Sequence, residues 1–202
     1  MKKNWQTKKL GEICDFQRGL TYSKRDEVDF SGNVVLRANN IDLSKNALDL
    51  TDLRYISDSV EVPDNKKVKK GSIIICTASG SKSHLGKAAM VDQDYGYAFG
   101  GFMGQLLPKE HIDSKFLFYL LTSDAYKNFI ERLSNGMNIN NLKFDDLATF
   151  EVSFPPLQDQ KKIVRNLDIF TAGVEKAQEN TQKKLLALKE LRRSVLKEAL
   201  AE

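Results

Sequence analysis

Hydrophobic residues in the last third of the chain recur in alternating steps of four and three. Ten positions share this spacing, and we call them the seam: Ile163, Leu167, Phe170, Val174, Ala177, Thr181, Lys184, Leu188, Leu191 and Val195. Only Thr181 and Lys184 are polar, so the pattern predicts the apolar stripe of a coiled coil. A helix over residues 158–200 would be about 64 Å long, and a rod of that length needs a partner along it.

Before this helix, short apolar or β-branched runs alternate with Gly, Asn, Asp and Pro, which is typical of strands separated by turns. The predicted strands cover residues 34–36, 72–76, 88–91, 104–107 and 149–153. Helical spacing predicts helices over 114–122, 124–133 and near 145–148, with Ser114 and Ser123 as N-caps of the first two. Pro155 and Pro156 cannot extend a strand, so we expect them to end the domain and start the long helix.

These patterns predict the fold class and the domain organisation. We expect an α/β (α+β) domain over residues 1–155, followed by a helical coiled-coil and dimerisation region over residues 156–202. The chain has 202 residues, of which 41% are hydrophobic and 29% charged, enough for a sizeable core. It has no apolar run as long as a membrane span and no signal-peptide pattern at its start, so we expect a cytoplasmic location.

Charge and cysteine content narrow the chemistry. The net charge of +4 and a pI near 8.9 suit a polyanionic partner without requiring one. Cys14 and Cys76 are too far apart for a CxxC motif, and we expect both to be reduced and structural. With His84 and His111 as the only histidines, we expect no metal site.

No intact catalytic motif is present, so we predict no catalytic residue. Between Gly80 and Gly86 lie five residues instead of the four of a phosphate-binding loop, and Ala88 follows Lys87 where Ser or Thr is needed. The glycines at 100, 101 and 104 lack GxGxxG spacing and are better explained by tight strand packing or a bend. A small enzyme that uses His84 or a carboxylate remains a competing interpretation, although no GxSxG motif accompanies the histidine.

Polar clusters in four loops are compatible with binding to nucleic acid, because Arg, Asn and Gln can pair with base edges and Lys with phosphates. The candidate DNA-binding residues, in loops 17–25, 37–40, 80–87 and 138–141, are Gln17, Arg18, Lys24, Arg25, Arg37, Asn39, Asn40, Lys82, Ser83, His84, Lys87, Asn138 and Asn140. A solvated loop or an Asx-turn is the alternative explanation for any one cluster alone.

The order of these segments resembles the specificity subunit of type I restriction-modification enzymes. The matching stretches are residues 5–19, 34–41, 70–74, 86–89, 115–117 and, most specifically, Phe154-Pro155-Pro156-Leu157-Gln158-Asp159-Gln160-Lys161-Lys162-Ile163-Val164. Asp159 departs from this pattern, because Glu is usual there. A typical member has two recognition domains and two conserved helices, whereas this sequence has one of each. That departure suggests a half-subunit, a truncated or phase-variable product, or an isolated half.

The resemblance implies a subunit that recognises double-stranded DNA and has no catalysis or cofactor of its own. S-adenosylmethionine, ATP and magnesium would belong to methyltransferase subunits and, where one exists, a restriction subunit. Two helices would pack antiparallel, from a homodimer or another half-subunit, and would hold two recognition domains on a bipartite target. The competing interpretation is an interaction module whose coiled coil assembles proteins and whose globular domain binds protein rather than DNA.

Overall fold

The structure, a computed structural model, describes residues 4–42, 44–81, 84–135 and 141–200. The chain forms two compact units, Met1–Gln160 and Lys161–Glu202, and we call the first the head. Four candidate DNA-binding residues, Lys82, Ser83, Asn138 and Asn140, lie outside the described residues.

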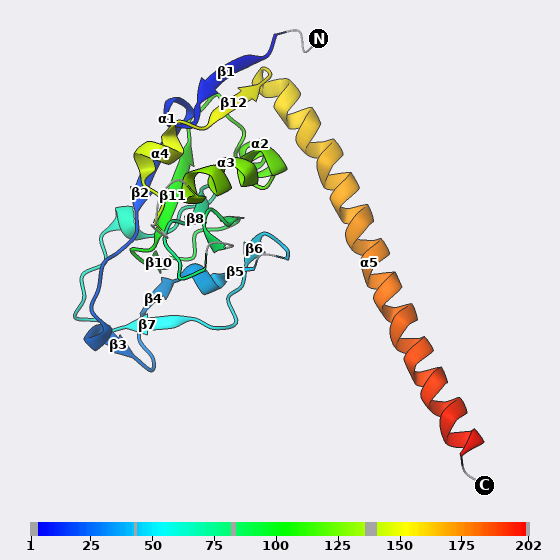
Figure 1. Cartoon of the computed structure of the whole chain (residues 1–202). Helices are drawn as coiled ribbons and strands as arrows, with labels where there is room; N and C mark the ends of the chain where they lie inside the picture. Colours follow the sequence, from blue (N-terminus) through cyan, green and yellow to red (C-terminus); the bar gives the residue numbers. More distant parts are fainter. Residues whose placement is uncertain (1–3, 43, 82–83, 136–140, 201–202) are drawn as a thin grey trace. The chain divides into compact units, whose positions relative to one another are not determined.

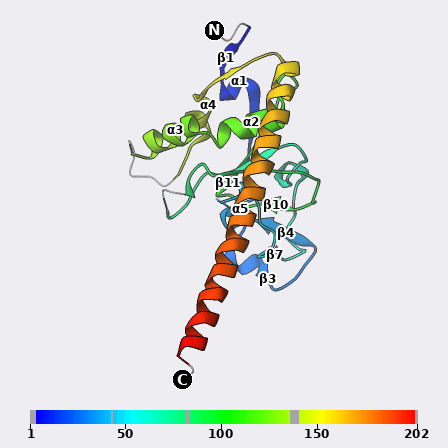
Figure 2. The ribbon, with the colours of Figure 1, turned by 90° about the vertical axis from the view of Figure 1, so that its right-hand side faces the viewer.

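Two four-stranded sheets form the centre of the head (Figure 1). The first is antiparallel throughout, in the order β2 (Cys14–Arg18), β11 (Met103–Pro108), β8 (Ile73–Cys76) and β9 (Ala88–Met90). The second has the order β10 (Ala98–Phe99), β4 (Asn33–Leu36), β7 (Arg54–Ile56) and β3 (Glu27–Val28), and β10 pairs in parallel with β4. Two strand pairs complete the head: β1 (Gln6–Lys9) with β12 (Glu151–Phe154), and β5 (Ile41–Asp42) with β6 (Ala47–Leu48). In both views β1 and β3 lie at opposite ends of the head (Figure 2).

Short helices connect or cover these strands. They are α1 (Leu10–Ile13), α2 (Ser114–Leu121), α3 (Asp124–Asn135) and α4 (Phe144–Ala148), with 3-10 turns η1 (Lys24–Asp26), η2 (Ala38–Asn40) and η3 (Asp64–Lys66). The predicted N-cap Ser114 is wrong by one residue. The Asp113 carboxylate caps α2 instead, because its Oδ1 accepts hydrogen bonds from the backbone N–H groups of Lys115 and Phe116, both at 3.0 Å.

The core lies around β8, whose four residues are all fully buried. Ile74 packs in one cluster with Leu36, Phe99 and Met103, so residues of both central sheets share this cluster. A strand that is buried on both faces is expected to be a continuous apolar run, and Ile73-Ile74-Ile75-Cys76 is such a run.

Glycines allow the two sheets to approach closely, as expected for the glycine-rich stretch before β11. A Cβ on Gly19 would lie 2.0 Å from the carbonyl oxygen of Gly100, a distance that no side chain could have. A Cβ on Gly104 would lie 2.6 Å from the ring of Phe144. The first contact brings the end of β2 next to the β10–β11 turn, and the second brings β11 against α4.

The two prolines separate β12, which ends at Phe154, from helix α5 (Leu157–Ala199), as predicted. Gln160, in the first turn of α5, is fully buried within the head. Its Oε1 accepts from the backbone N–H of Asp113 at 2.8 Å. Its Nε2 donates to the carbonyl oxygens of Pro155 at 2.9 Å and His111 at 3.1 Å. The side chain therefore satisfies three backbone groups of the head at once.

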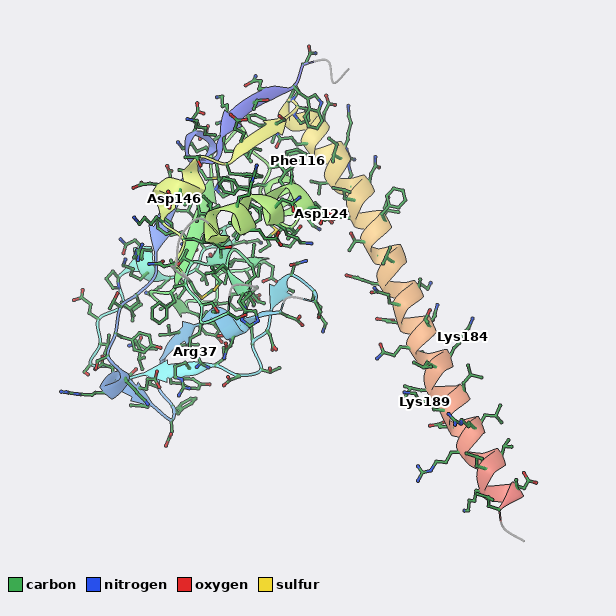
Figure 3. All side chains as sticks on the ribbon, viewed as in Figure 1. Arg37, Phe116, Asp124, Asp146, Lys184 and Lys189 are labelled. Atoms are coloured by element: carbon green, nitrogen blue, oxygen red, sulfur yellow. The ribbon has the colours of Figure 1, made fainter. Side chains whose placement is uncertain are left out.

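Helix α5 is a continuous helix of 43 residues. A mixed α/β domain followed by a long helix confirms this part of the predicted fold class. Among the seam residues, Ile163 and Leu167 are half-buried and those from Phe170 onward are exposed. Figure 3 shows Lys184, which belongs to the seam, and Lys189, which does not, leaving the helix on different sides. Among the described residues, no helix is both long and apolar enough to cross a membrane.

Candidate nucleic-acid interface

A hollow of about 610 Å³ in the head collects side chains from five segments that are far apart in the sequence. We call it the basic hollow, and it is lined by Arg18, Leu20, Thr21, Tyr22, Lys24, Glu27, Arg37, Ala38, Asn39, Ala78, Ser79, Gly100, Gly101, Phe102, Met103 and Asn141. Three of these residues are cationic and one is a carboxylate. The loops at 17–25 and 37–40 therefore share one surface. Asn141, the last residue of the predicted loop 138–141, and Ser79, next to the predicted loop 80–87, reach it as well.

Strand β2 ends at Arg18, which brings this side chain to the hollow. Its guanidinium lies 5.4 Å from the centre of the Phe144 ring, a distance at which a cation is attracted to an aromatic face. The Lys66 ammonium donates to the Arg18 carbonyl oxygen at 2.8 Å. The ring contact restricts the side chain of Arg18 and the hydrogen bond restricts its backbone, while the residue stays exposed.

Arg37 and Lys24 are placed by local hydrogen bonds. Arg37 forms an ion pair with Asp52 at 3.0 Å, and one quarter of its side chain remains exposed. Figure 3 shows it among the strands of the second sheet. Lys24 begins η1, whose capping residue Ser23 accepts from the Arg25 N–H at 3.3 Å. Lys24 itself is exposed, so its charge is available at the surface of the hollow.

The carbonyl group of Phe102 connects two further segments to the hollow. It accepts hydrogen bonds from the N–H groups of Thr77 and Ala78, at 2.9 and 3.1 Å. Ala78 in turn forms an antiparallel bridge with Asn141, and the Leu142 N–H donates to the Thr77 carbonyl at 2.7 Å. Through these contacts Phe102 and Asn141 reach the hollow, together with Ser79 from the same stretch.

Tyr22 and Glu27 give the hollow a neutral and a negative group. Partial burial, and then the charge of Glu27, raise the pKa of the Tyr22 phenol, so it stays protonated at neutral pH. Glu27 is paired with Arg54 at 3.2 Å, which offsets its negative charge. The hollow thus keeps a cationic balance with a polar hydroxyl on its wall.

Three of the predicted DNA-binding side chains turn into the head. Asn40 is 1% exposed: its Oδ1 accepts from the Arg37 N–H, and its Nδ2 donates to the carbonyl oxygens of Asp49 and Asp52, all at 2.8 Å. Its burial contradicts the prediction of a DNA contact, because a side chain satisfied inside the domain cannot pair with a base.

Lys87 and Gln17 are also occupied internally. The Lys87 ammonium donates to the Ile41 carbonyl at 3.0 Å, and desolvation by burial lowers its pKa. The Gln17 Oε1 accepts from the buried Gln105 amide at 3.0 Å. Both are half-buried and neither lines the basic hollow, so their assignment as DNA ligands stays a prediction. Arg25 and His84 do not line the hollow.

Sequence reasoning missed Phe102 and Ser79 as lining residues, and it named the loops that contain Tyr22 and Asn141 without singling out these two side chains. Phe102 follows two glycines and precedes a buried strand, a position that reads as core in a hydrophobic pattern. Its 73% exposure is visible only in the folded chain. An aromatic residue directly after Gly-Gly, at a predicted turn, is the one signal that could have indicated an exposed ring.

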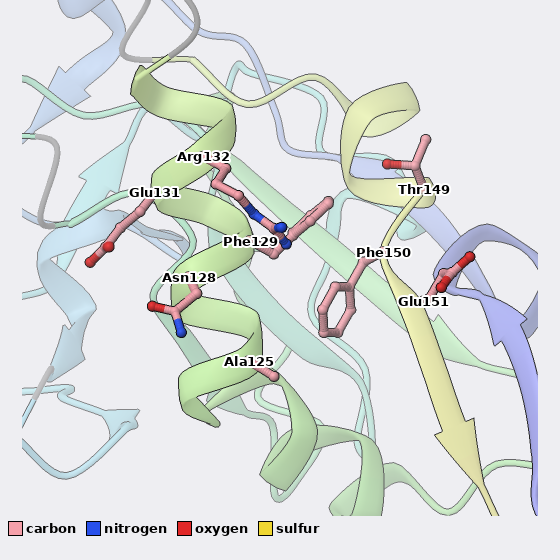
Figure 4. A pocket seen from close by; sticks show the side chains of 8 residues that line it. All are labelled: Ala125, Asn128, Phe129, Glu131, Arg132, Thr149, Phe150 and Glu151. Atoms are coloured by element: carbon pink, nitrogen blue, oxygen red, sulfur yellow. The ribbon is translucent and has the colours of Figure 1, made fainter.

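A second hollow, of about 700 Å³, lies between α3 and the segment Thr149–Glu151 (Figure 4). The Phe129 and Phe150 rings meet there, with their centres 4.9 Å apart. Its charged lining residues are Glu131, Glu151 and Arg132, so carboxylates outnumber the cation. This balance disfavours a polyanion, and the basic hollow is the better candidate for one.

The described residues offer no arrangement for metal or thiol chemistry. Within those ranges, no group of three or more His, Cys, Asp or Glu side chains is placed to hold a metal ion. Cys14 and Cys76 are buried free thiols. Burial raises the pKa of Cys14 to about 12 and raises that of Cys76 as well, so neither is a thiolate at neutral pH.

Comparison with known proteins shows which family this chain resembles. Residues 2–185 match the type I restriction modification DNA specificity domain. The StySPI specificity subunit of Salmonella potsdam is 32% identical over 200 residues, and the EcoKI specificity subunit of Escherichia coli K12 is 33% identical over 195 residues. These alignments cover 98% and 95% of this chain.

Solved structures share the architecture. A structure of a type I R-M system superposes with a TM-score of 0.69 at 21% identity, over 93% of this chain and 44% of that one. The HsdS subunit of Thermoanaerobacter tengcongensis gives a TM-score of 0.62 at 20% identity, over 86% and 39%. The chain spans 42% and 41% of the StySPI and EcoKI subunits. It belongs to the type I restriction-modification DNA specificity family.

Proposed function

We propose that the head recognises a DNA sequence for a type I restriction-modification complex and that catalysis resides in other chains. The observation that carries this proposal is the basic hollow, where Arg18, Lys24 and Arg37 lie with Asn39 and Asn141 on one surface. Cations hold phosphates without reading sequence, whereas amides can pair with base edges. One surface with both kinds of group suits sequence-dependent binding of DNA.

The reaction chemistry would come from partners. In this proposal methyltransferase subunits bind S-adenosylmethionine, and a restriction subunit, where present, uses ATP and magnesium. The head contributes orientation: Arg18 and Lys24 hold the register on the phosphates, and the amides select the bases. The subunit names of the relatives support this division of labour.

We further propose that α5 pairs with the α5 helix of a second copy. The exposed seam residues include Phe170 at 73%, Leu188 at 63% and Leu191 at 60%. These apolar side chains recur at coiled-coil spacing on a helix of 43 residues. A matching helix would remove them from water, which is the main stabilising effect in such contacts.

Charge favours an antiparallel pair. In a parallel pair in register, each seam residue meets its own copy, so two Lys184 ammonium groups would face each other in an apolar seam. In an antiparallel pair with its two-fold axis near Thr181, the stretch from Leu167 to Val174 meets that from Leu188 to Val195. Lys184 then lies beside Gln178 instead. Such a dimer would present two heads to a bipartite target.

Salt-dependent binding of DNA by the full chain tests the proposed function. Lys24→Ala should lower the slope of log affinity against log salt by about 0.9 per head, because one phosphate contact is lost. The matched control is Lys127→Ala. That lysine is 62% exposed and lies on α3, outside the basic hollow, so the same loss of charge should leave the slope unchanged.

Two results would refute the proposal. Binding that does not respond to salt would favour the competing interpretation, in which the head binds protein. Equal slopes for Lys24→Ala and the wild-type chain would show that phosphates are held elsewhere.

A further inference from the structure

We propose that Phe102 is a base-stacking residue: its ring lies against the face of a base at a step of the duplex that the protein opens. This inference rests on the proposed function and adds a residue to it. It names a contact that acts through an aromatic surface instead of charge or hydrogen bonding.

The first argument is exposure. Phe102 is 73% exposed, although it lies between Gly101 and the fully buried Met103. Leaving a phenyl ring in water forgoes the stabilisation that burial would give. An exposed ring alone is ordinary on a protein surface, but this one lines a hollow that also holds three cationic side chains, which suits a partner with both an apolar face and negative charge.

The second argument is the rigidity of the backbone that carries the ring. The Phe102 carbonyl accepts from Thr77 N–H and Ala78 N–H at 2.9 and 3.1 Å. On either side, the Met103 N–H donates to the Gly100 carbonyl at 2.9 Å, and the Gly100 N–H donates to the Leu36 carbonyl at 2.8 Å. The turn is anchored to both central sheets. Ordering the backbone that carries the ring thus adds little to the entropy cost of binding.

The third argument is the surroundings. Phe102 shares the hollow with Arg18, Lys24, Arg37 and Asn141. Proteins that bind single-stranded or bent nucleic acids combine cationic side chains with exposed apolar or aromatic ones. The cations neutralise phosphates while bases stack on the aromatic face. Unstacking a base step costs a few kcal/mol, and these phosphate contacts would offset that cost.

Phe30 provides a contrast within the same head. It is 81% exposed, and its ring lies 5.2 Å from the ring of Tyr55. It already has an aromatic partner and does not line the basic hollow. A general affinity of exposed phenyl rings for DNA would involve both residues, whereas the proposal involves Phe102 alone.

The experiment uses the full chain and a duplex that this chain has enriched from a randomised library. 2-Aminopurine is placed at successive positions, and fluorescence reports a base that loses its neighbour. Wild type should raise the signal at one step. Phe102→Ala and Phe102→Leu should lose this rise and bind about tenfold to a hundredfold more weakly. Phe102→Tyr should retain both, and Phe30→Ala should match wild type.

The leucine variant separates stacking from a simple apolar contact, such as one with a thymine methyl group, which Leu can also make. Wild-type binding by Phe102→Leu or Phe102→Ala, or a signal that none of the variants alters, overturns the stacking role while the proposed function stands. Failure of the wild-type chain to enrich any duplex overturns the proposed function and this inference with it. Urea unfolding of each variant confirms that the head is intact.

Discussion

Replacing Leu188 by aspartate should weaken self-association of α5, whereas the same replacement of Leu186 should not. Both leucines are exposed in the single chain, at 63% and 56%. Two residues apart on a helix means about 200° around its axis, so the two side chains lie on nearly opposite faces. Leu188 belongs to the seam and Leu186 does not. The pair controls for residue type, exposure, charge and helix propensity together.

The expected size of the effect follows from the exposed surface. Burying a leucine completely contributes about 1.5–3 kcal/mol. Since 63% of Leu188 is open to water, covering it contributes about 1–2 kcal/mol in each copy, or about 2–4 kcal/mol in a dimer. Losing that contribution raises the dissociation constant about 30-fold to several hundred-fold. The buried aspartate charge adds to this loss.

Sedimentation equilibrium over nanomolar to micromolar concentrations measures the dimer dissociation constants of the wild type, Leu186→Asp and Leu188→Asp. Circular dichroism checks that both variants keep the same helix content. Equal weakening by Leu186→Asp and Leu188→Asp would refute the seam as the interface. A wild-type chain that stays monomeric at micromolar concentration would refute the homodimer and leave a different helix as the partner. Leu167, which is half-buried in the single chain, is a poorer probe of the dimer.

Further predictions concern the head, with urea unfolding as the assay for each. Gly104→Ala should lower the free energy of unfolding by about 1–3 kcal/mol, because its methyl group would lie 2.6 Å from the Phe144 ring; an unchanged midpoint would contradict this packing. Asn40→Ala should lower the free energy of unfolding by about 2–4 kcal/mol, because three hydrogen bonds are lost. Asn39→Ala, at the exposed neighbour, should change it by no more than about 0.5 kcal/mol. Similar losses in both variants would contradict the structural role of Asn40. Burial raises the pKa of Cys14 from 9.0 to about 12, so the thiol ionises first in the unfolded chain and stability falls as pH rises above 9. Between pH 8 and 10 the free energy of unfolding of the wild type should fall by about 1.4 kcal/mol more than that of Cys14→Ala. Parallel pH profiles of the two proteins would disprove this effect of burial.

The sequence pattern was sufficient for elements with continuous local signals. The buried run of β8 and the periodic helix α5 appear where they were predicted. The strand Cys14–Arg18 was missed because its apolar and polar residues alternate over only four positions, with Cys14 and Phe16 as its apolar residues, which is too short a signal to stand out. Strands β3, β5, β6 and β10 have only two residues each, so tertiary pairing defines them instead of local propensity.

The candidate site, too, could be predicted only in part from the sequence. Residue types suggested which loops could contact DNA, but convergence of these loops depends on long-range contacts such as the Ala78–Asn141 bridge and the approach of Gly19 to Gly100. Asn39 and Asn40 have the same side chain, yet one is exposed and the other buried. Only the fold distinguishes a surface amide from one that holds the backbone of its own loop.

The side chain of Gln160 has a chemical consequence for the junction where α5 begins. An amide neither gains nor loses a proton in the physiological range, and the three backbone groups that it binds carry no charge. Glutamate is nearly identical in shape but cannot donate to the two carbonyl oxygens, so exchanging one nitrogen for oxygen would turn attraction into repulsion. We therefore expect the three hydrogen bonds of Gln160 to be insensitive to pH and ionic strength. A salt concentration that releases a nucleic acid from the head would leave these bonds intact.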